Sequence, residues 1–383
     1  MFKSKHTIDI KSGQLLLDVE SSDLPLNEIC GFASRQNPKR GFLFVSKVLG
    51  KHYPVKPSRM QEIYNLLSEK ISIDKNSSAL FLGFAETATG LSSGIYDTWK
   101  NKNLQNSYFI HTTRYKFEGK EVLFNFHEEH SHATGHIVYQ PEDDKFKLEK
   151  FDTLVLVDDE ITTGKTMTNF IDEFLKLNNC RVKKIVVVCI KNWMVSESVN
   201  KFNSAFPEIK IEFVQILKGT YDFIKNDSFV CESMPNVDGN GSSKNDLITK
   251  NHGRFGSAVL PKYNFSSLKN KFDLNKKTLV LGTGEFSYHP FLMAKYLEES
   301  GCDVNYQSTT RSPIIVGNDI AHKITFKDNY GDNILNFIYN VQPEQYEQVI
   351  ICYETNKVEG FTLDQELCAT NIFFEELLET KAV

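Results

Sequence analysis

The stretch LVLVDDEITTGKTMTNF, residues 154–170, predicts a strand, a tight loop and a helix in immediate succession. Its first four residues are apolar and are bounded by turn-forming residues, which is typical of a strand buried in a parallel sheet. After the loop, apolar side chains recur at helical spacing, at Met167, Phe170, Ile171, Phe174 and Leu175. A loop that ends at a helix N-terminus presents unpaired backbone N–H groups, so the stretch predicts an anion-binding site.

The two acids between the strand and the loop narrow the choice of anion. A triphosphate-binding P-loop needs a glycine five positions before Gly164, and Asp159 occupies that position, so the spacing excludes a P-loop. Asp158 and Asp159 stand at the carboxyl end of the strand, where open α/β sheets bind ligands. Carboxylates accept hydrogen bonds from hydroxyl groups, so a pair of them beside a phosphate-binding loop suits a ribose 5-phosphate. The alternative is an ordinary strand–turn–helix with a capping threonine.

The stretch resembles the phosphoribosyl diphosphate (PRPP) motif of type I phosphoribosyltransferases, an apolar strand followed by two acids and a Thr-Thr-Gly-x-Thr turn. The resemblance implies that Asp158 and Asp159 hold the ribose diol and stabilise positive charge on the sugar in the transition state. It implies Mg²⁺ as the cofactor, carried by PRPP near the two aspartates without a direct protein ligand. The residues expected to hold the 5-phosphate are Thr162, Thr163, Gly164, Lys165 and Thr166.

Length and composition limit the class of protein. The chain has 383 residues, enough for two domains, and its 44 basic and 49 acidic residues leave a net charge of −5, which argues against a nucleic-acid partner. The seven cysteines are odd in number and contain no Cys-x-x-Cys pair, so we expect reduced thiols and a cytoplasmic location. No apolar run approaches a membrane span, and the N-terminus lacks a signal-peptide core.

Strand and helix signals alternate along the chain, which predicts an α/β fold with a doubly wound parallel sheet. The first domain is expected at 1–230. The stretch 231–256 is rich in Asn, Gly, Ser and charge and is predicted to be a linker. The pattern then resumes, so a second, smaller α/β domain is expected at 257–383.

The two domains share an order of short sequences. LGFAET precedes HTTR in the first, and LGTGEF precedes TTRSP in the second, with 28 positions from Glu86 to Arg114 and 26 from Glu285 to Arg311. LVLVDD in the first domain then corresponds to VIICYE in the second, which lacks the two aspartates. Either the second domain is a degenerate copy of the first, or two α/β units share generic features by chance.

The family's diphosphate loop is expected at GFAETATG, residues 83–90, because this segment follows a predicted strand. The backbone N–H groups of Glu86, Thr87 and Ala88 are expected to bind the leaving diphosphate. Glu86 is an unusual residue beside a diphosphate unless it faces a metal ion or a basic residue. Its alternative role is that of an ordinary acid at a helix N-terminus.

The family also closes a loop over the reacting centre, and residues 114–136 are the expected counterpart. Lys116, Glu129 and His132 are its candidate catalytic residues. The histidines of HEEH lack the helical zinc spacing, which disfavours a metal site. A plain polar hairpin is the other alternative.

The segment 37–57 mixes basic residues with alternating apolar ones and is similar to the base-side hood of orotate-type phosphoribosyltransferases. Arg40, Ser46 and Lys47, with Lys51, are therefore expected to face an acidic or polar base. The alternative is a solvated strand face.

The stretches STTRSPII, residues 308–315, and GTGEFSYHPF, residues 282–291, resemble the TRSP domain. The whole chain is thus similar to bacterial phosphoribosyltransferase–TRSP proteins encoded with tellurite-resistance and stress-response clusters, which implies a role in making a nucleoside-like metabolite. A second-domain pocket for a phosphate or carboxylate is expected from Gly284, Glu285, Arg311 and Ser312. Structural use of the arginine as an ion-pair partner is the alternative.

These observations predict an enzyme that moves a 5-phosphoribosyl group between PRPP and a nitrogenous base, or that runs the reverse reaction on a nucleotide. We expect a homodimer without membrane contact, working with enzymes of the same pathway. A non-catalytic PRPP or nucleotide sensor is the alternative class. A relative of PRPP synthetase, built from two such folds, would need an ATP site that the sequence does not display.

Overall fold

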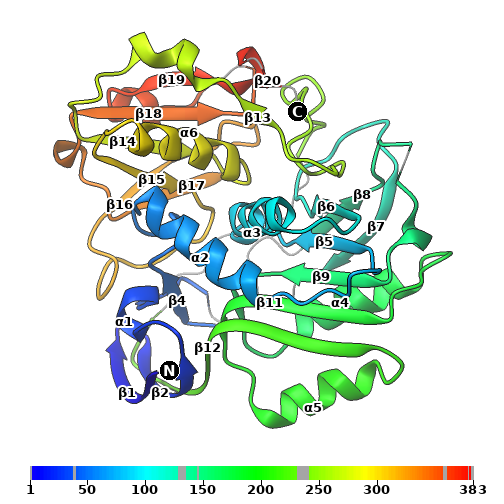
Figure 1. The fold of residues 1–383 in the computed structure, drawn as a ribbon. Helices are drawn as coiled ribbons and strands as arrows, with labels where there is room; N and C mark the ends of the chain where they lie inside the picture. Colours follow the sequence, from blue (N-terminus) through cyan, green and yellow to red (C-terminus); the bar gives the residue numbers. More distant parts are fainter. Residues whose placement is uncertain are drawn as a thin grey trace.

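The computed structural model describes residues 2–37, 40–127, 135–144, 146–230, 241–356, 360–377 and 379–380. It contains two α/β units, one from each half of the chain, with helices packed between their sheets (Figure 1). The α/β class predicted from the sequence is confirmed.

The first sheet has the strand order β1-β2-β12-β11-β9-β5-β6, and β10 pairs with β11 beside this path. From β12 to β6 all neighbours are parallel, whereas β1 and β2 join antiparallel at one edge. The bounds are β1 Phe2–Ile10, β2 Gly13–Ser22, β5 Ala79–Gly83, β6 Ser107–His111, β9 Thr153–Val157, β10 Glu160–Ile161, β11 Lys184–Asn192 and β12 Lys210–Lys225.

The predicted parallel sheet is confirmed from β12 to β6, and β1 and β2 extend it as antiparallel strands. Strand β2, which lies between the edge strand β1 and β12, buries Leu15, Leu17 and Val19 in alternation, the period of a strand with one buried face. By contrast, β9 lies at the centre and buries both faces. Leu154 and Leu156 belong to one core, and Val155 and Val157 to the other, which explains the uninterrupted apolar run.

Helices α2 and α3 cover one face of the first sheet, and α4 covers the other together with the β7–β8 hairpin. The same core that holds α2 and α3 also holds α6 of the second half, so the two units share one continuous apolar layer. The helix bounds are α1 Leu26–Ile29, α2 Pro57–Lys70, α3 Ala88–Lys102, α4 Lys165–Leu175, α5 Ser196–Ala205, α6 Tyr288–Glu299 and α7 Leu363–Glu366. Short 3₁₀ helices run over Leu148–Lys150, Phe265–Lys271, Pro343–Gln345 and Phe374–Glu376.

The second sheet has the order β15-β14-β18-β19 and is parallel throughout. Its strands are β14 Thr278–Gly282, β15 Val304–Ser308, β18 Gln348–Tyr353 and β19 Thr370–Phe373. The two-stranded pairs are β3 Cys30–Ser34 with β4 Phe42–Ser46, β7 Val122–His127 with β8 Gly135–Tyr139, β16 Lys323–Lys327 with β17 Leu335–Tyr339, and β13 Lys262–Tyr263 with β20 Glu379–Thr380.

The two sheets repeat one arrangement. The order β6-β5-β9-β11 of the first matches β15-β14-β18-β19 of the second, in the same chain sequence and with the same parallel direction. In each half an antiparallel hairpin, β7–β8 or β16–β17, stands between the second and third of these strands in the chain. The order of short sequences shared by the two halves therefore corresponds to a shared order of strands.

The segment expected to link the domains is packed where the structure describes it, from residue 241 onward. Lys244, Ile248 and Arg254 are all buried, and Lys244 forms an ion pair of 2.5 Å with Asp332 of the second half. The domain boundaries stay a prediction. Within the described ranges, every helix is too short or too polar to cross a membrane.

Candidate active site

A cavity of about 180 Å³ lies at the carboxyl ends of β5 and β9. Helix α3 leaves β5 toward one face of the sheet and α4 leaves β9 toward the other, so the loops after these two strands separate. Such a switch point is where open α/β sheets bind ligands. The cavity is lined by both loops, by the β3–β4 hairpin and by residues 310–312 of the second half.

The loop expected to hold the 5-phosphate forms one wall of this cavity. Thr162, Thr163, Gly164, Lys165 and Thr166 all line it, and α4 begins at Lys165. Gly164 has a φ of +77°, and a Cβ there would lie 2.9 Å from the Met194 side chain. The glycine thus permits a left-handed turn in a space without room for a side chain, and the turn places the first residues of α4 at the cavity.

The two aspartates of the motif also line the cavity, and a buried lysine stands behind them. Lys191 Nζ, at the end of β11, is 3.9 Å from Asp159 Oδ2 and 3.3 Å from Glu160 Oε2. Arg40 pairs with Glu160 from the opposite side at 2.5 Å. Burial opposes ionisation of Glu160, but Arg40 and Lys191 outweigh it and hold its pKa below the usual value. Glu160 is therefore ionised and ties the strand end to the hairpin.

In the loop expected to hold the diphosphate, Glu86 and Thr87 line the cavity, while Ala88 is buried at the start of α3. The Glu86 carboxylate faces two cations, with Lys51 Nζ at 3.0 Å from Oε1 and Arg311 Nε at 3.7 Å from Oε2. Burial alone would raise the pKa of Glu86, but these cations lower it, so the group is an anion held between cations.

Of the expected closing loop, the structure describes residues 114–127 and 135–136. Glu129 and His132 lie outside the described residues, and Lys116 is exposed and does not line the cavity. Arg114 and His136, from the same segment, do line it. His136 Nδ1 lies 2.9 Å from the hydroxyl of Thr112, which holds the ring beside the diphosphate loop.

On the base side, Arg40 lines the cavity, whereas Ser46 and Lys47 point elsewhere. Ser46 Oγ accepts a hydrogen bond from the Val48 N–H at 3.5 Å, and Lys47 pairs with Asp319 at 2.8 Å. The remaining lining on this side comes from Arg35, Leu43, Phe44 and His52. Burial, with Lys191 and Lys51, lowers the pKa of His52 to about 3, so its imidazole is neutral at pH 7.

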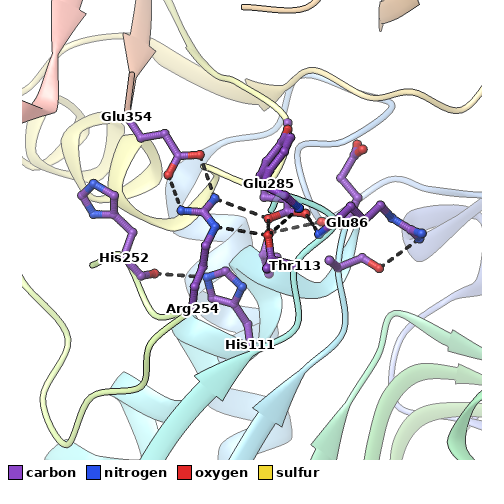
Figure 2. A network of polar contacts seen from close by, with 12 residues as sticks. Glu86, His111, Thr113, His252, Arg254, Glu285 and Glu354 are labelled. Carbon is purple, nitrogen blue, oxygen red and sulfur yellow. Dashed lines mark hydrogen bonds and ion pairs between the residues drawn. The ribbon is translucent and has the colours of Figure 1, made fainter. Parts of the chain in front are cut away.

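The four residues expected to form a pocket in the second domain are divided between two places. Arg311 and Ser312, with Thr310, line the cavity of the first half. Glu285 lines a separate, much smaller cavity, where it lies 3.4 Å from Arg254 (Figure 2). Gly284 contributes its carbonyl oxygen to the Lys51 ammonium at 2.9 Å. The cavity at the PRPP motif is thus built from both halves of the chain.

Two protein-family models match the parts of the chain that form this cavity. A model described as "Phosphoribosyl transferase" matches residues 29–220, which contain every first-half residue that lines the cavity. The chain belongs to this phosphoribosyltransferase family. A model described as "TRSP domain C terminus to PRTase_2" matches residues 251–369, so the resemblance to phosphoribosyltransferase–TRSP proteins is confirmed. Comparison with curated proteins gives no match.

Several solved phosphoribosyltransferases are similar to parts of the chain. Adenine phosphoribosyltransferase from Trypanosoma brucei, in complex with AMP, pyrophosphate and ribose-5-phosphate, is 14% identical, with 52% of this chain and 82% of that one covered and a TM-score of 0.35. The adenine enzyme from Rhodothermus marinus is 12% identical, with 50% and 95% covered and a TM-score of 0.31. A hypoxanthine phosphoribosyltransferase from Staphylococcus aureus is 15% identical, with 38% and 69% covered and a TM-score of 0.25.

The donor set near the motif suits a Mg²⁺ ion that a phosphate ligand would carry. Mg²⁺ in enzymes that act on phosphates is bound by one or two carboxylates, by substrate oxygens and by water. Asp158 and Asp159 supply two carboxylates at the cavity wall. Across the described part of the chain, no three His, Cys, Asp or Glu side chains gather in a group that would hold a metal ion by themselves.

Sequence reasoning did not assign several residues of this site, among them Lys191, Arg35, His52 and His136. A signal existed for Lys191, since it interrupts the apolar strand KIVVVCIKN, and a charge in a buried strand needs a partner. Arg35 and His52 carried no comparable signal. Their position depends on the β3–β4 hairpin and the chain after it, which fold against both halves.

Proposed function

We propose that the protein is a Mg²⁺-dependent phosphoribosyltransferase, which moves a 5-phosphoribosyl group between PRPP and a nitrogenous base. The observation that carries the proposal is the position of the motif: two aspartates and a Thr-Thr-Gly-Lys-Thr loop line one cavity at the switch point of the sheet. A ribose 5-phosphate needs groups that accept hydrogen bonds from its hydroxyls and a loop that binds its phosphate. Both come from the single segment 158–166.

The roles of the motif residues follow from their chemistry. The N–H groups at the start of α4 and the threonine hydroxyls accommodate the 5-phosphate, with Gly164 allowing its close approach. Asp158 and Asp159 accept hydrogen bonds from the ribose diol. As the bond at C1 breaks, positive charge develops on the sugar, and the nearby carboxylates stabilise it without reorganising. Lys191 and Arg40 hold the strand end that carries these acids.

The leaving diphosphate is assigned to the loop at Glu86 and Thr87, which lines the same cavity as the phosphate loop. Mg²⁺ would neutralise part of its charge when bound with PRPP. His136 and Arg114 stand beside this loop, at the base of the segment expected to close over the substrate. Lys116, Glu129 and His132 stay predictions as residues of that closing segment.

The base is assigned to the wall formed by the β3–β4 hairpin and the residues that follow it. Phe44 and Leu43 offer apolar contact for a flat ring, and Arg35, Arg40 and neutral His52 offer polar contact at its edge. This lining supports a polar or acidic heterocycle. The role in a stress-linked pathway stays a prediction that rests on the resemblance. The cytoplasmic location, which rests on the cysteine pattern, and the homodimer also stay predictions.

Calorimetry and thermal denaturation test the proposal. PRPP with Mg²⁺ is expected to stabilise the folded protein by about 2.7 kcal/mol at a hundredfold excess over Kd, and the same titration of Thr163→Val, which lacks the hydroxyl in the loop, should give weaker binding. If millimolar PRPP leaves the melting temperature unchanged, the proposed function is wrong. Diphosphate release with a panel of bases then separates an enzyme from a PRPP sensor, since a sensor binds without turnover.

A further inference from the structure

The two halves share more than their strand order, because the same hydrogen bonds recur at the ends of their strands. In each half, two threonines follow the second strand, β6 or β15, and their hydroxyl oxygens accept hydrogen bonds from backbone N–H groups at matched positions. A tyrosine in the hairpin of each half accepts a hydrogen bond from another backbone N–H group, again at matched positions. The matched pairs are Ala85 N with Thr112 Oγ1 and Gly284 N with Thr309 Oγ1, both at 2.8 Å; Tyr115 N with Thr113 Oγ1 and Ser312 N with Thr310 Oγ1, both at 3.2 Å; and Phe117 N with Tyr139 Oη and Ile314 N with Tyr339 Oη, both at 2.8 Å.

Each half also lends a short arm to the other. Val55, which precedes the first parallel strand, exchanges two backbone hydrogen bonds of 2.9 and 2.8 Å with Tyr306 of β15. Ser257, which precedes the second half's sheet, exchanges bonds of 2.8 and 2.9 Å with Phe109 of β6. Tyr306 and Phe109 occupy the same register in their sheets. Reciprocal contacts of this kind are those of a two-fold related pair.

A basic residue on each arm meets the equivalent glutamate. Lys51 on the first arm pairs with Glu86 at 3.0 Å, and Arg254 on the second lies 3.4 Å from Glu285. Glu86 directly follows Ala85, and Glu285 directly follows Gly284, the two residues whose N–H groups donate to matched threonines. The chain is thus arranged as two related units around an approximate two-fold axis, with the glutamate loops at the contact between them.

The site of the second half is closed by its own side chains. Strand register places Tyr353 where Asp158 stands and Glu354 where Asp159 stands. Arg254 donates to both oxygens of the Glu354 carboxylate, at 2.6 and 2.8 Å (Figure 2). Tyr330 donates to the same carboxylate at 2.8 Å. The remaining cavity measures about 10 Å³, at most the room of one water molecule.

The site of the first half is open, and the second half completes it. The Arg311 side chain is 8% exposed, stacks over the Tyr115 ring at 5.2 Å and reaches the Glu86 carboxylate in the cavity wall. Its counterpart, Arg114, lines the same cavity. Lys51, Arg311 and Arg114 all act on the Glu86 carboxylate and lower its pKa, so cations gather beside the diphosphate loop. A planar guanidinium is suited to bidentate contact with phosphate oxygens.

We propose that the second half stands where a second subunit would stand, and that its Arg311 binds the diphosphate of PRPP in the only substrate site of the pair. The inference rests on the proposed function, since it takes the cavity at Asp158 and Asp159 as the PRPP site. Each chain then binds one PRPP, and the second half contributes to substrate binding as well as to the core.

Isothermal titration of the full chain with inorganic diphosphate plus Mg²⁺, ribose 5-phosphate and PRPP tests this assignment. Arg311→Gln is expected to weaken diphosphate and PRPP binding by about tenfold to a hundredfold, the range for a charged hydrogen-bond partner. Binding of ribose 5-phosphate should change less than threefold, because its phosphate lies at the other loop. Wild-type protein should bind one PRPP per chain.

Arg59→Gln is the matched control, because it removes the same charge from a partly exposed arginine of α2 that pairs with Glu28 and Glu62. It should bind all three ligands as the wild type does. If Arg311→Gln does not fold, Arg311→Lys replaces it, and diphosphate binding should fall several-fold because one ammonium cannot give bidentate contact.

The outcomes separate the two proposals. If wild-type protein binds none of the three ligands, the proposed function fails together with this inference. If it binds PRPP but the Arg311 variant binds diphosphate within twofold of wild type, only the role of Arg311 is overturned. Two PRPP molecules per chain would overturn the closed second site.

Discussion

Replacing the buried lysine behind the aspartates is the sharpest test of how the site is held. Lys191 has a side chain with no exposed surface, and its ammonium donates to the Phe44 carbonyl at 3.2 Å. Its Nζ also lies 3.3 Å from Glu160 Oε2 and 3.9 Å from Asp159 Oδ2. Lys191→Met keeps most of the volume and removes only the charge and its donors.

The expected cost follows from what is left behind. Glu160 keeps Arg40 but loses Lys191, the buried cation 3.3 Å from its Oε2. Removing one member of a buried ion pair costs about 3–5 kcal/mol, because the remaining charge stays desolvated. Lys191→Met should therefore lower the free energy of unfolding by about that amount at pH 7, measured by urea denaturation.

The loss should depend on pH in a defined direction. The pKa of Glu160 is lowered in the folded protein, so its stabilisation is complete above the unfolded carboxyl pKa and is lost as pH falls through the folded value. The pKa of Lys191 is raised by Glu160 despite burial, so its stabilisation is complete below the unfolded lysine pKa and is lost as pH rises through the folded value. The difference between wild type and variant should form a plateau between about pH 5 and 10.

Lys210→Met is the matched control for this experiment. Lys210 lies on the adjacent strand β12 and pairs with Glu212 at 2.7 Å, but its side chain is 70% exposed. Solvent screens an exposed pair and weakens it, so this variant should unfold almost as the wild type does. If Lys191→Met costs less than about 1 kcal/mol at pH 7, the buried ion-pair argument is wrong.

Two further predictions concern the motif itself. Asp158→Asn and Asp159→Asn should lower turnover in a diphosphate-release assay by about a hundredfold while changing the Kd of PRPP far less, because an amide still hydrogen-bonds the diol; wild-type turnover in both would refute the ribose assignment. Gly164→Ala should lose at least about 1 kcal/mol more stability than Gly119→Ala, since the two glycines have φ of +77° and +75° but only the first would meet neighbouring atoms; equal melting temperatures would refute the packing argument.

The sequence by itself determined the local structure around its motif. The run Leu154–Val157 is apolar at every position because β9 is buried on both faces, so its strand and central place could be recognised without neighbours. The loop and the helix after it followed from glycine and helical periodicity, which are properties of contiguous residues. The order of short sequences shared by the halves indicated their matching strand order, because each short sequence marks a strand and its loop from contiguous residues.

Only the tertiary structure decided which distant residues meet at the cavity. Arg311 was expected in a pocket of its own domain, and it lies in the first half's cavity because the two units pack around a shared helix layer. Arg254 stood in an expected linker, and it closes the second site because the arm that carries it crosses to β6. Side-chain periodicity encodes which face of an element is buried, but the partner across an interface depends on packing between segments separated by 200 residues or so.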